Sequence, residues 1–229
     1  MAMHFLITAG GTREYIDPVR FISNASSGRM GYALARAALK AGHAVTLITA
    51  PTALKPPAGA EVVAVESAAE MFAAVKEHFS DCDCLIMAAA VADYTPAHPS
   101  KTKIKKDGGL KPTLQLKPTA DILKWAGRNK AGRGQKAKDK GSRVCHAHRL
   151  PRIIVGFALE DQNLRANAER KMRDKHLDMI IANPPTAIDA KTSTVHIKTR
   201  NSPWIELAGK NKAVIARRIV SLAETASAT

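Results

Sequence analysis

"GRMGYALARAALKAG" (residues 28–42), followed by "AVTLITA" (44–50), is the stretch that decides the fold. In the first segment apolar residues recur with the period of an amphipathic helix, whereas the second is a short apolar run rich in β-branched residues, as buried strands are. A similar run, "HFLITAG" (4–10), stands earlier in the chain. The order strand, helix, strand favours a parallel sheet.

The same alternation continues along the chain. Further strands are expected at residues 61–65, 84–90, 152–158 and 178–183, and helices at 67–81, 119–127 and 163–177. Near-continuous apolar strands separated by helices are typical of a parallel sheet that is covered on both faces. We therefore predict a single α/β domain over residues 1–229, with a Rossmann-like, doubly wound, mostly parallel sheet.

Two stretches interrupt this alternation. Prolines, glycines and alternating lysines in residues 93–118 predict a long excursion, with "KTKIKK" (101–106) and "TLQLK" (113–117) as the arms of a ribbon. Near the C-terminus, "STVHIKTRNSPWIELAG" (193–209) predicts a hairpin, and "KNKAVIARRIVSLAE" (210–224) predicts a last helix.

Composition excludes several classes of protein. The longest apolar runs are far shorter than the roughly 20 residues that a membrane helix needs, and the N-terminus lacks the basic region of a secretory signal. We therefore expect a soluble, cytoplasmic protein without a membrane partner. The cysteines Cys82, Cys84 and Cys145 match no common zinc or redox spacing. We predict no metal held by protein side chains.

The net charge of +15 is unevenly distributed. Residues 128–152 hold nine Lys and Arg against one Asp, so the rest of the chain carries +7. A Gly/Lys/Arg-rich composition cannot build a core, which predicts a flexible basic insertion on the surface. No aromatic RNA-binding strand, zinc-finger spacing or recognition helix accompanies it. A nucleic-acid-binding α/β protein that uses this insertion is the alternative to an enzyme.

The loop before the first helix is suited to phosphate. In α/β sheets, ligands bind outside the carboxyl ends of the strands, where a helix N-terminus offers free N–H groups. Ser26 or Ser27 can cap this helix, and Gly28 lets the backbone approach a ligand. An ordinary helix cap is the alternative. A nicotinamide-dependent dehydrogenase is excluded because no G-x-G-x-x-G follows the first strand and no acidic residue ends the second.

Six short motifs, in order, resemble phosphopantothenoylcysteine synthetase. They are "DPVRFISNASSGRMG", "AAAVADY", "KIKK", "PTADIL", "IVGFALE" and "ERKMRDKHLD", and the likeness spans residues 6 to 183. The resemblance implies a ligase that condenses 4′-phosphopantothenate with L-cysteine through an acyl-nucleotide intermediate. It also implies CTP as co-substrate, with ATP less favoured, and Mg²⁺.

The resemblance implies roles for residues before the first helix. Asn24 matches the family's catalytic asparagine, whose amide holds the intermediate; an Asx turn is the alternative. Arg20 would bind an anionic group of the substrate, although it could equally hold its own loop through Asp17. Ser26, Ser27 and Gly28 would cradle the phosphates.

Further site residues follow the later motifs. Asp93 aligns with a residue near the nucleotide base, or else forms a turn, and Ala88, Ala89 and Ala90 leave room for the ligand. Lys103 would reach the triphosphate or acyl phosphate, whereas a lysine run by itself usually marks a solvated face. The remaining nucleotide contacts implied are Ala120, Asp121, Ile122, Leu123, Phe157, Lys171 and Lys175, and Asn183 would lie near the same cleft with the substrate.

The resemblance also bears on partners. Members of the family are commonly homodimers in which the lysine excursion crosses towards the partner. In many bacteria this domain follows a flavin-dependent decarboxylase in one chain. No such half precedes Met1, so we expect no FMN, and a separate decarboxylase is a candidate partner. The sequence departs from the family pattern at Gly11, where many members have Pro, at Ala120, where Pro is usual, and in the length of the basic segment 126–152.

Overall fold

The computed structural model describes residues 2–106, 113–130, 152–187, 190–200 and 202–227. Its centre is an eight-stranded sheet with the order β12-β11-β10-β9-β6-β1-β4-β5. The strands are β1 (His4–Ala9), β4 (Ala44–Thr49), β5 (Glu61–Ala64), β6 (Cys84–Met87), β9 (Ile153–Leu159), β10 (Met179–Asn183), β11 (Thr192–Thr199) and β12 (Ile205–Asn211). The strands from β10 to β5 pair in parallel, whereas β11 pairs antiparallel with both of its neighbours, β10 and β12.

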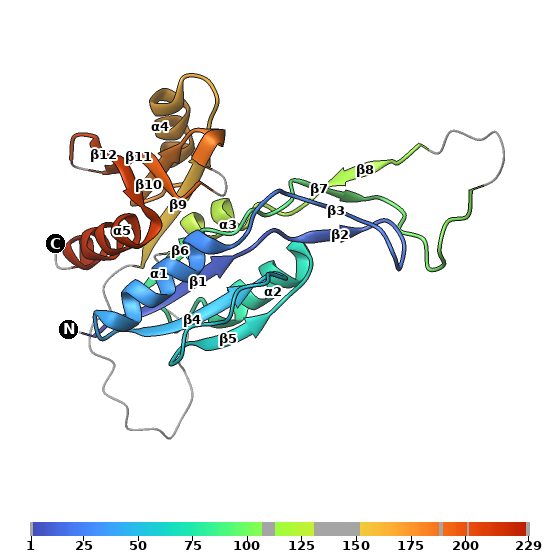
Figure 1. Ribbon diagram of the computed structural model, residues 1–229, viewed down its shortest axis with the longest axis horizontal. Coiled ribbons are helices and arrows are strands. Elements are labelled where there is room, and N and C mark those ends of the chain that lie inside the picture. The colour runs from blue at the N-terminus through green and yellow to red at the C-terminus, as the bar shows by residue number, and fades with distance from the viewer. Residues whose placement is uncertain (1, 107–112, 131–151, 188–189, 201, 228–229) are drawn as a thin grey trace.

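Helices cover both faces of this sheet (Figure 1). α1 (Arg29–Lys40) and α5 (Lys212–Ser227) pack together on one face, and α2 (Ala68–His78), α3 (Ile122–Asn129) and α4 (Leu164–Asp174) lie on the other. Successive strand residues serve opposite cores: Phe5 and Ile7 of β1 pack with α1 and α5, while Leu6 packs on the opposite side. This period of two confirms the predicted doubly wound α/β fold.

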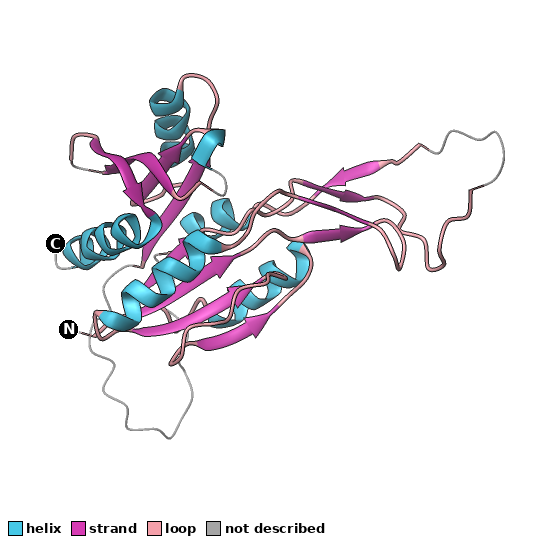
Figure 2. Cartoon of the chain, viewed as in Figure 1, coloured by secondary structure: helices cyan, strands magenta, loops and turns pink. Residues whose placement is uncertain are grey.

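Two short ribbons form an arm that extends away from the sheet (Figure 2). One pairs β2 (Arg13–Tyr15) with β3 (Phe21–Ser23), and the other pairs β7 (Tyr94–Pro96) with β8 (Leu116–Pro118). The first ribbon follows β1 and the second follows β6, and they lie side by side through contacts of β2 with β7. The long excursion at 93–118 is therefore confirmed, whereas the β2–β3 ribbon was not predicted because three-residue strands have too little pattern.

The expected ribbon arm at residues 101–106 is wrong, because β8 pairs with residues 94–96 instead. The backbone of the 101–106 segment bonds to the β2–β3 turn: the Ile104 N–H donates to Asp17 Oδ2 at 3.1 Å, and Arg20 Nη2 donates to the Ile104 carbonyl at 2.7 Å. Asp17 is buried and also pairs with the Arg20 guanidinium. These donors, Arg20 foremost, outweigh burial and hold the pKa of Asp17 well below its ordinary value.

The predicted C-terminal hairpin and last helix are confirmed as β11, β12 and α5. A 3₁₀ turn, η2 (Pro185–Ala187), follows β10. Most of the predicted basic insertion at 128–152 lies outside the described residues. No helix within the described ranges is long and apolar enough to cross a membrane.

Candidate functional site

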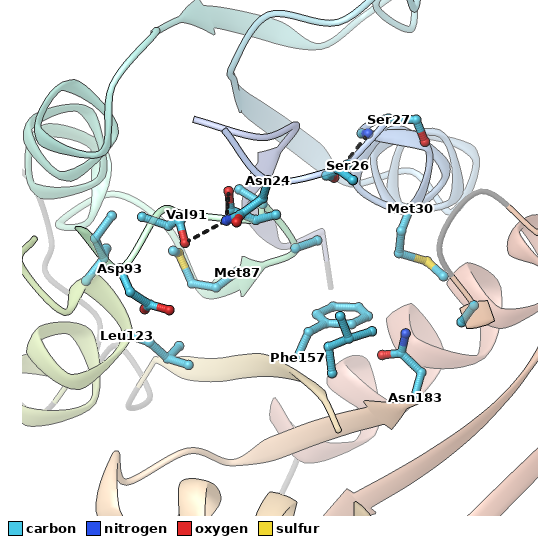
Figure 3. Close-up of a pocket in the computed structure, with 18 of the residues that line it drawn as sticks. Asn24, Ser26, Ser27, Met30, Met87, Val91, Asp93, Leu123, Phe157 and Asn183 are labelled. Carbon is cyan, nitrogen blue, oxygen red and sulfur yellow. Dashed lines mark hydrogen bonds between the residues drawn. The ribbon is translucent and has the colours of Figure 1, made fainter. Parts of the chain in front are cut away.

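A cavity of about 570 Å³ opens where several parallel strands end. Met87, Leu159 and Asn183, the last residues of β6, β9 and β10, all line it. Figure 3 shows Met87, Phe157 and Asn183 across the floor of this cavity, with Asn24 and Ser26 from the segment before α1 beside them. The position agrees with the rule that ligands of open α/β sheets bind beyond the carboxyl ends of the strands.

The segment Asn24–Gly28, here called the α1 loop, lines the cavity and leads into α1. The helix cap is Gly28, in the left-handed conformation with φ of 75°, and α1 has neither a side-chain cap nor an acidic residue in its first turn. The expected capping by Ser26 or Ser27 is therefore wrong, because Gly28 occupies the cap position. Ser26 Oγ accepts the Gly28 N–H at 3.4 Å, which is not a bond to the first turn of the helix. An N-terminus without an anionic cap favours an anionic ligand.

Asn24 joins the α1 loop to the segment that follows β6. Its Nδ2 donates to the carbonyls of Ala90 and Val91 at 3.1 and 3.2 Å. Among the described residues, none donates to Asn24 Oδ1. The side chain is exposed to the cavity, and Figure 3 shows it between Val91 and Ser26.

A second wall comes from α3 and α4. Asp121 accepts the N–H of Lys124 at the start of α3, and its Oδ2 forms an ion pair with Lys175 Nζ at 2.8 Å. Burial alone would raise the pKa of Asp121, but the Lys175 and Lys124 hydrogen bonds hold it below its ordinary value. Lys171 Nζ donates to the Phe157 carbonyl at 2.7 Å. Burial, and then the charge of Lys175, lowers the Lys171 pKa.

Most of the predicted site residues lie together in this cavity. Those that line it are Asn24, Ser26, Ser27, Gly28, Ala88, Ala89, Ala90, Asp93, Ala120, Asp121, Ile122, Leu123, Phe157, Lys171, Lys175 and Asn183. Arg20 and Lys103 do not line it. Arg20 is held by Asp17, as the alternative reading of its motif expected, and Lys103 is exposed on the arm.

Comparison with known proteins identifies the family. A family model described as DNA/pantothenate metabolism flavoprotein C-terminal domain matches residues 1–226. The chain belongs to this family. Membership confirms the resemblance that the sequence motifs indicated.

Individual members of the family cover the chain to different extents. The coenzyme A biosynthesis bifunctional protein CoaBC of Bacillus subtilis is 46% identical over 182 residues, which are 79% of this chain and 40% of that protein. A crystal structure of the C-terminal domain of a CoaBC protein is 38% identical, with a TM-score of 0.76 over 97% of this chain and 94% of that one. A DNA/pantothenate metabolism flavoprotein from Streptococcus pneumoniae is 25% identical, with a TM-score of 0.79 over 98% of this chain and 99% of that one.

This flavoprotein C-terminal domain spans only part of its bifunctional relatives. The chain covers between 40% and 57% of the length of the curated relatives it matches.

Sequence reasoning missed part of the cavity of this flavoprotein C-terminal domain. The residues that line it but were not predicted are Ala25, Arg29, Met30, Met87, Val91, Thr119, Leu159, Ala187, Ser193, Val195 and Lys212. Several of them adjoin predicted motifs and could have been found by continuity. Ser193, Val195 and Lys212 come from the C-terminal hairpin and helix, and no motif in the sequence marked them.

Few of the described side chains that line the cavity could bind a divalent cation. Within the described ranges, no three His, Cys, Asp or Glu side chains are grouped as a metal site. Mg²⁺ in nucleotide enzymes is commonly bound by one or two carboxylates together with substrate phosphates. Asp93 lines the cavity, and no described residue forms a hydrogen bond or ion pair with its carboxylate. The described carboxylates therefore form no metal site of their own, and Mg²⁺ would be held chiefly by the substrate phosphates and water.

Proposed function

We propose that this chain is a phosphopantothenate-cysteine ligase of coenzyme A biosynthesis, which uses CTP in preference to ATP. One observation supports this most: the cavity places the α1 loop, at a helix N-terminus without an anionic cap, in the same space as Lys171 and Lys175. Family membership supports the same reaction. The two substrates are then 4′-phosphopantothenate and L-cysteine.

The first step joins two negatively charged molecules. A carboxylate oxygen of 4′-phosphopantothenate attacks the α-phosphorus of CTP, a new O–P bond forms, and the bond from the α-phosphorus to the bridging oxygen breaks, so that pyrophosphate leaves with the electron pair. Such a reaction depends on positioning and on neutralising charge. In the proposal, the α1 loop N–H groups and Lys171 and Lys175 supply the donors and cations, and Mg²⁺ adds charge neutralisation when bound.

The second step forms the amide. The neutral amine of L-cysteine attacks the acyl carbon, a C–N bond forms, and CMP leaves as the C–O bond breaks; the nitrogen loses its extra proton to solvent. We assign Asn24 to hold the acyl-nucleotide during this attack. Its Nδ2 bonds to Ala90 and Val91 fix the side chain at the junction of the α1 loop and the β6 end, where the reacting carbonyl would lie.

The base of the nucleotide is assigned to the side of the cavity formed by the β6 end, β9 and the start of α3. Ala88, Ala89 and Ala90 leave space beside the base, Phe157 offers an aromatic side chain, and Asp93 lines the same cavity. Backbone groups of Ala120–Leu123 would read the edge of the base. When the wrong base binds, the polar groups of the site that would pair with the correct base stay unpaired. The free-energy cost of these unpaired groups discriminates between CTP and ATP.

Turnover tests the proposed reaction. Purified protein with 4′-phosphopantothenate, L-cysteine and Mg²⁺ is expected to release pyrophosphate with CTP, and much less with ATP. Pyrophosphate release and amide formation are measured together, and omission of cysteine is the control for the first step. Absence of turnover with both nucleotides from folded protein would contradict the proposal.

We also propose a homodimer in which Lys103 serves the partner's cavity. The arm carries exposed apolar side chains, including Val19 (59% exposed) and Tyr94 (57%), and Lys103 lies outside its own cavity. Contact with a second copy of the chain would remove these apolar side chains from water. The cytoplasm is the proposed location, and a separate flavin decarboxylase is a proposed further partner.

Mixing two variants tests the shared site. Lys103→Ala and Asn24→Ala homodimers are each expected to be nearly inactive. After subunit exchange, a mixed dimer contains one cavity with both Asn24 and a partner's Lys103, so activity should return in part. Light scattering measures the oligomeric state. A monomer, or mixtures that stay inactive despite exchange, would contradict this arrangement.

A further inference from the structure

The two walls of the cavity come from opposite faces of the sheet. Lys171 lies in α4 and Lys175 caps its C-terminus, and the buried residues of α4 pack on one face with α2 and α3. The α1 loop leads into α1, which packs with α5 on the other face. Polar and cationic side chains therefore face the cavity from both sides of the sheet.

The wall on the α1 side has donors of its own. Lys212, the first residue of α5, lines the cavity, and its Nζ donates to the carbonyls of Ala190 at 2.9 Å and Ala187 at 3.4 Å. Ser193 of β11 and Asn183 at the end of β10 line the same cavity. An ammonium, a hydroxyl and an amide can each donate hydrogen bonds to phosphate oxygens.

The position of these donors relative to the α1 loop defines an end of the cavity. Figure 3 shows Asn183 on the same side of the view as Met30, which lies in the first turn of α1, and on the opposite side from Asp93 and Leu123. Among the described residues that line the cavity, the acidic side chains are Asp93 and Asp121, which follow β6 and begin α3. The described residues Asn183, Ser193 and Lys212 form the other end of the cavity, here called the α5 end, and none of these three is acidic.

We propose that the α5 end binds the terminal phosphates of the nucleoside triphosphate and the pyrophosphate that leaves. This inference rests on the proposed function. The base would lie towards Asp93 and Asp121, the α-phosphate near Asn24, and the β- and γ-phosphates beyond it, between the α1 loop and Lys212. As the bond between the α-phosphorus and the bridging oxygen breaks, the electron pair and the negative charge go to pyrophosphate. Donors at the α5 end stabilise that charge.

Binding of three probes separates this role from a structural one. CTP contains the terminal phosphates, inorganic pyrophosphate represents them alone, and CMP lacks them. For Lys212→Met we expect the dissociation constants of CTP and pyrophosphate to rise about tenfold, as for the loss of one charge-assisted contact, while that of CMP changes less than about twofold. Ser193→Ala should produce the same pattern with a smaller change. Titration calorimetry measures all three without turnover.

Lys210→Met is the matched control, because Lys210 is exposed, lies two residues away, and does not line the cavity. It should leave all three dissociation constants unchanged. Lys212→Arg, which keeps the charge and the donors, should restore part of the affinity lost in Lys212→Met. Thermal unfolding of each variant reports whether the fold is intact.

Either of two results would overturn the inference. One is an equal loss of CMP and CTP affinity in both the Lys212→Met and Ser193→Ala variants. This result would mean that the two side chains act near the base or have only a structural role. The other is unchanged pyrophosphate and CTP affinity in both. Should the wild-type chain turn over CTP while the variants bind all probes normally, only this inference fails. Should the wild type bind pyrophosphate with the expected dependence on Lys212 yet form no amide, the proposed function fails instead.

Discussion

An Asn24→Ala variant is expected to release a burst of pyrophosphate but to form the amide about 10²- to 10³-fold more slowly than the wild type, the cost typical of losing one donor that stabilises the transition state. In the proposed reaction, activation of the carboxylate depends on the phosphate contacts, which this variant keeps. Attack by the cysteine amine depends on the acyl-nucleotide being held at Asn24. The acyl-nucleotide should therefore accumulate, and rapid quench with mass detection measures it.

A structural contribution must be separated from this effect. Asn24 Nδ2 also bonds to the carbonyls of Ala90 and Val91, and each such bond contributes about 1 kcal/mol to stability. Asn129→Ala is a matched control, because Asn129 Nδ2 donates to the Trp125 carbonyl at 2.8 Å outside the cavity. It removes one such bond rather than two, so it should lose less stability than Asn24→Ala and no activity. If the pyrophosphate burst and amide formation fall by the same factor in Asn24→Ala, Asn24 acts before or during activation, and the assigned role is wrong.

Gly127→Ala is expected to lower the free energy of unfolding by about 3 kcal/mol, at the upper end of the cost of overpacking a core. Gly127 is buried in α3, and a Cβ added there would overlap the carbonyl oxygen of Lys175, with His176 Cβ at 3.4 Å. Helix propensity alone would favour alanine by about 1 kcal/mol. The clash is with backbone and cannot be relieved by a rotamer change, so it dominates.

This clash also reaches the cavity. Asp121 begins α3 and Lys175 ends α4, so separating the two helices lengthens their ion pair and displaces both side chains from the nucleotide wall. A chain of this size should show a melting temperature lower by roughly 6–12 °C, together with weaker CTP binding. Thermal unfolding and calorimetry measure the two effects.

Gly209→Ala is the control for introducing a Cβ without a clash. At Gly209 an added Cβ meets no atom within 4 Å, and its φ of 60° costs an alanine about 1 to 2 kcal/mol. That variant should lose some stability and keep its CTP affinity. A Gly127→Ala protein that is as stable as the wild type would mean that α3 and α4 can separate without cost, against the packing described above.

Most of the fold could be predicted from local sequence patterns, because the same strand and helix patterns recur along the chain. Short apolar runs rich in β-branched residues and helical periods of 3.6 residues were enough to predict six parallel strands, the four helices between them, and the C-terminal hairpin and helix. The prediction failed where a strand was very short, or where several neighbouring residues could fill the same structural position. The β2–β3 ribbon has strands of three residues, and Ser26 and Ser27 look like helix caps although Gly28 occupies that position.

The sequence itself therefore determined the succession of strands and helices along the chain. It also determined which residues make up the α1 loop, the β6 end and the pair Lys171 and Lys175. Each of these depends on neighbours within one or two helical turns or on a short motif. Only the tertiary structure decided which of these residues meet. Arg20 and Lys103 carry the same motif signal as Asn24, yet the arm holds them away from the cavity, because Asp17 engages Arg20 and the Ile104 backbone. Lys212 carries no motif and reaches the cavity, because α5 packs beside α1 and begins at the edge of the sheet where the parallel strands end. Contacts between residues far apart in the chain depend on how whole elements pack, and no local pattern records them.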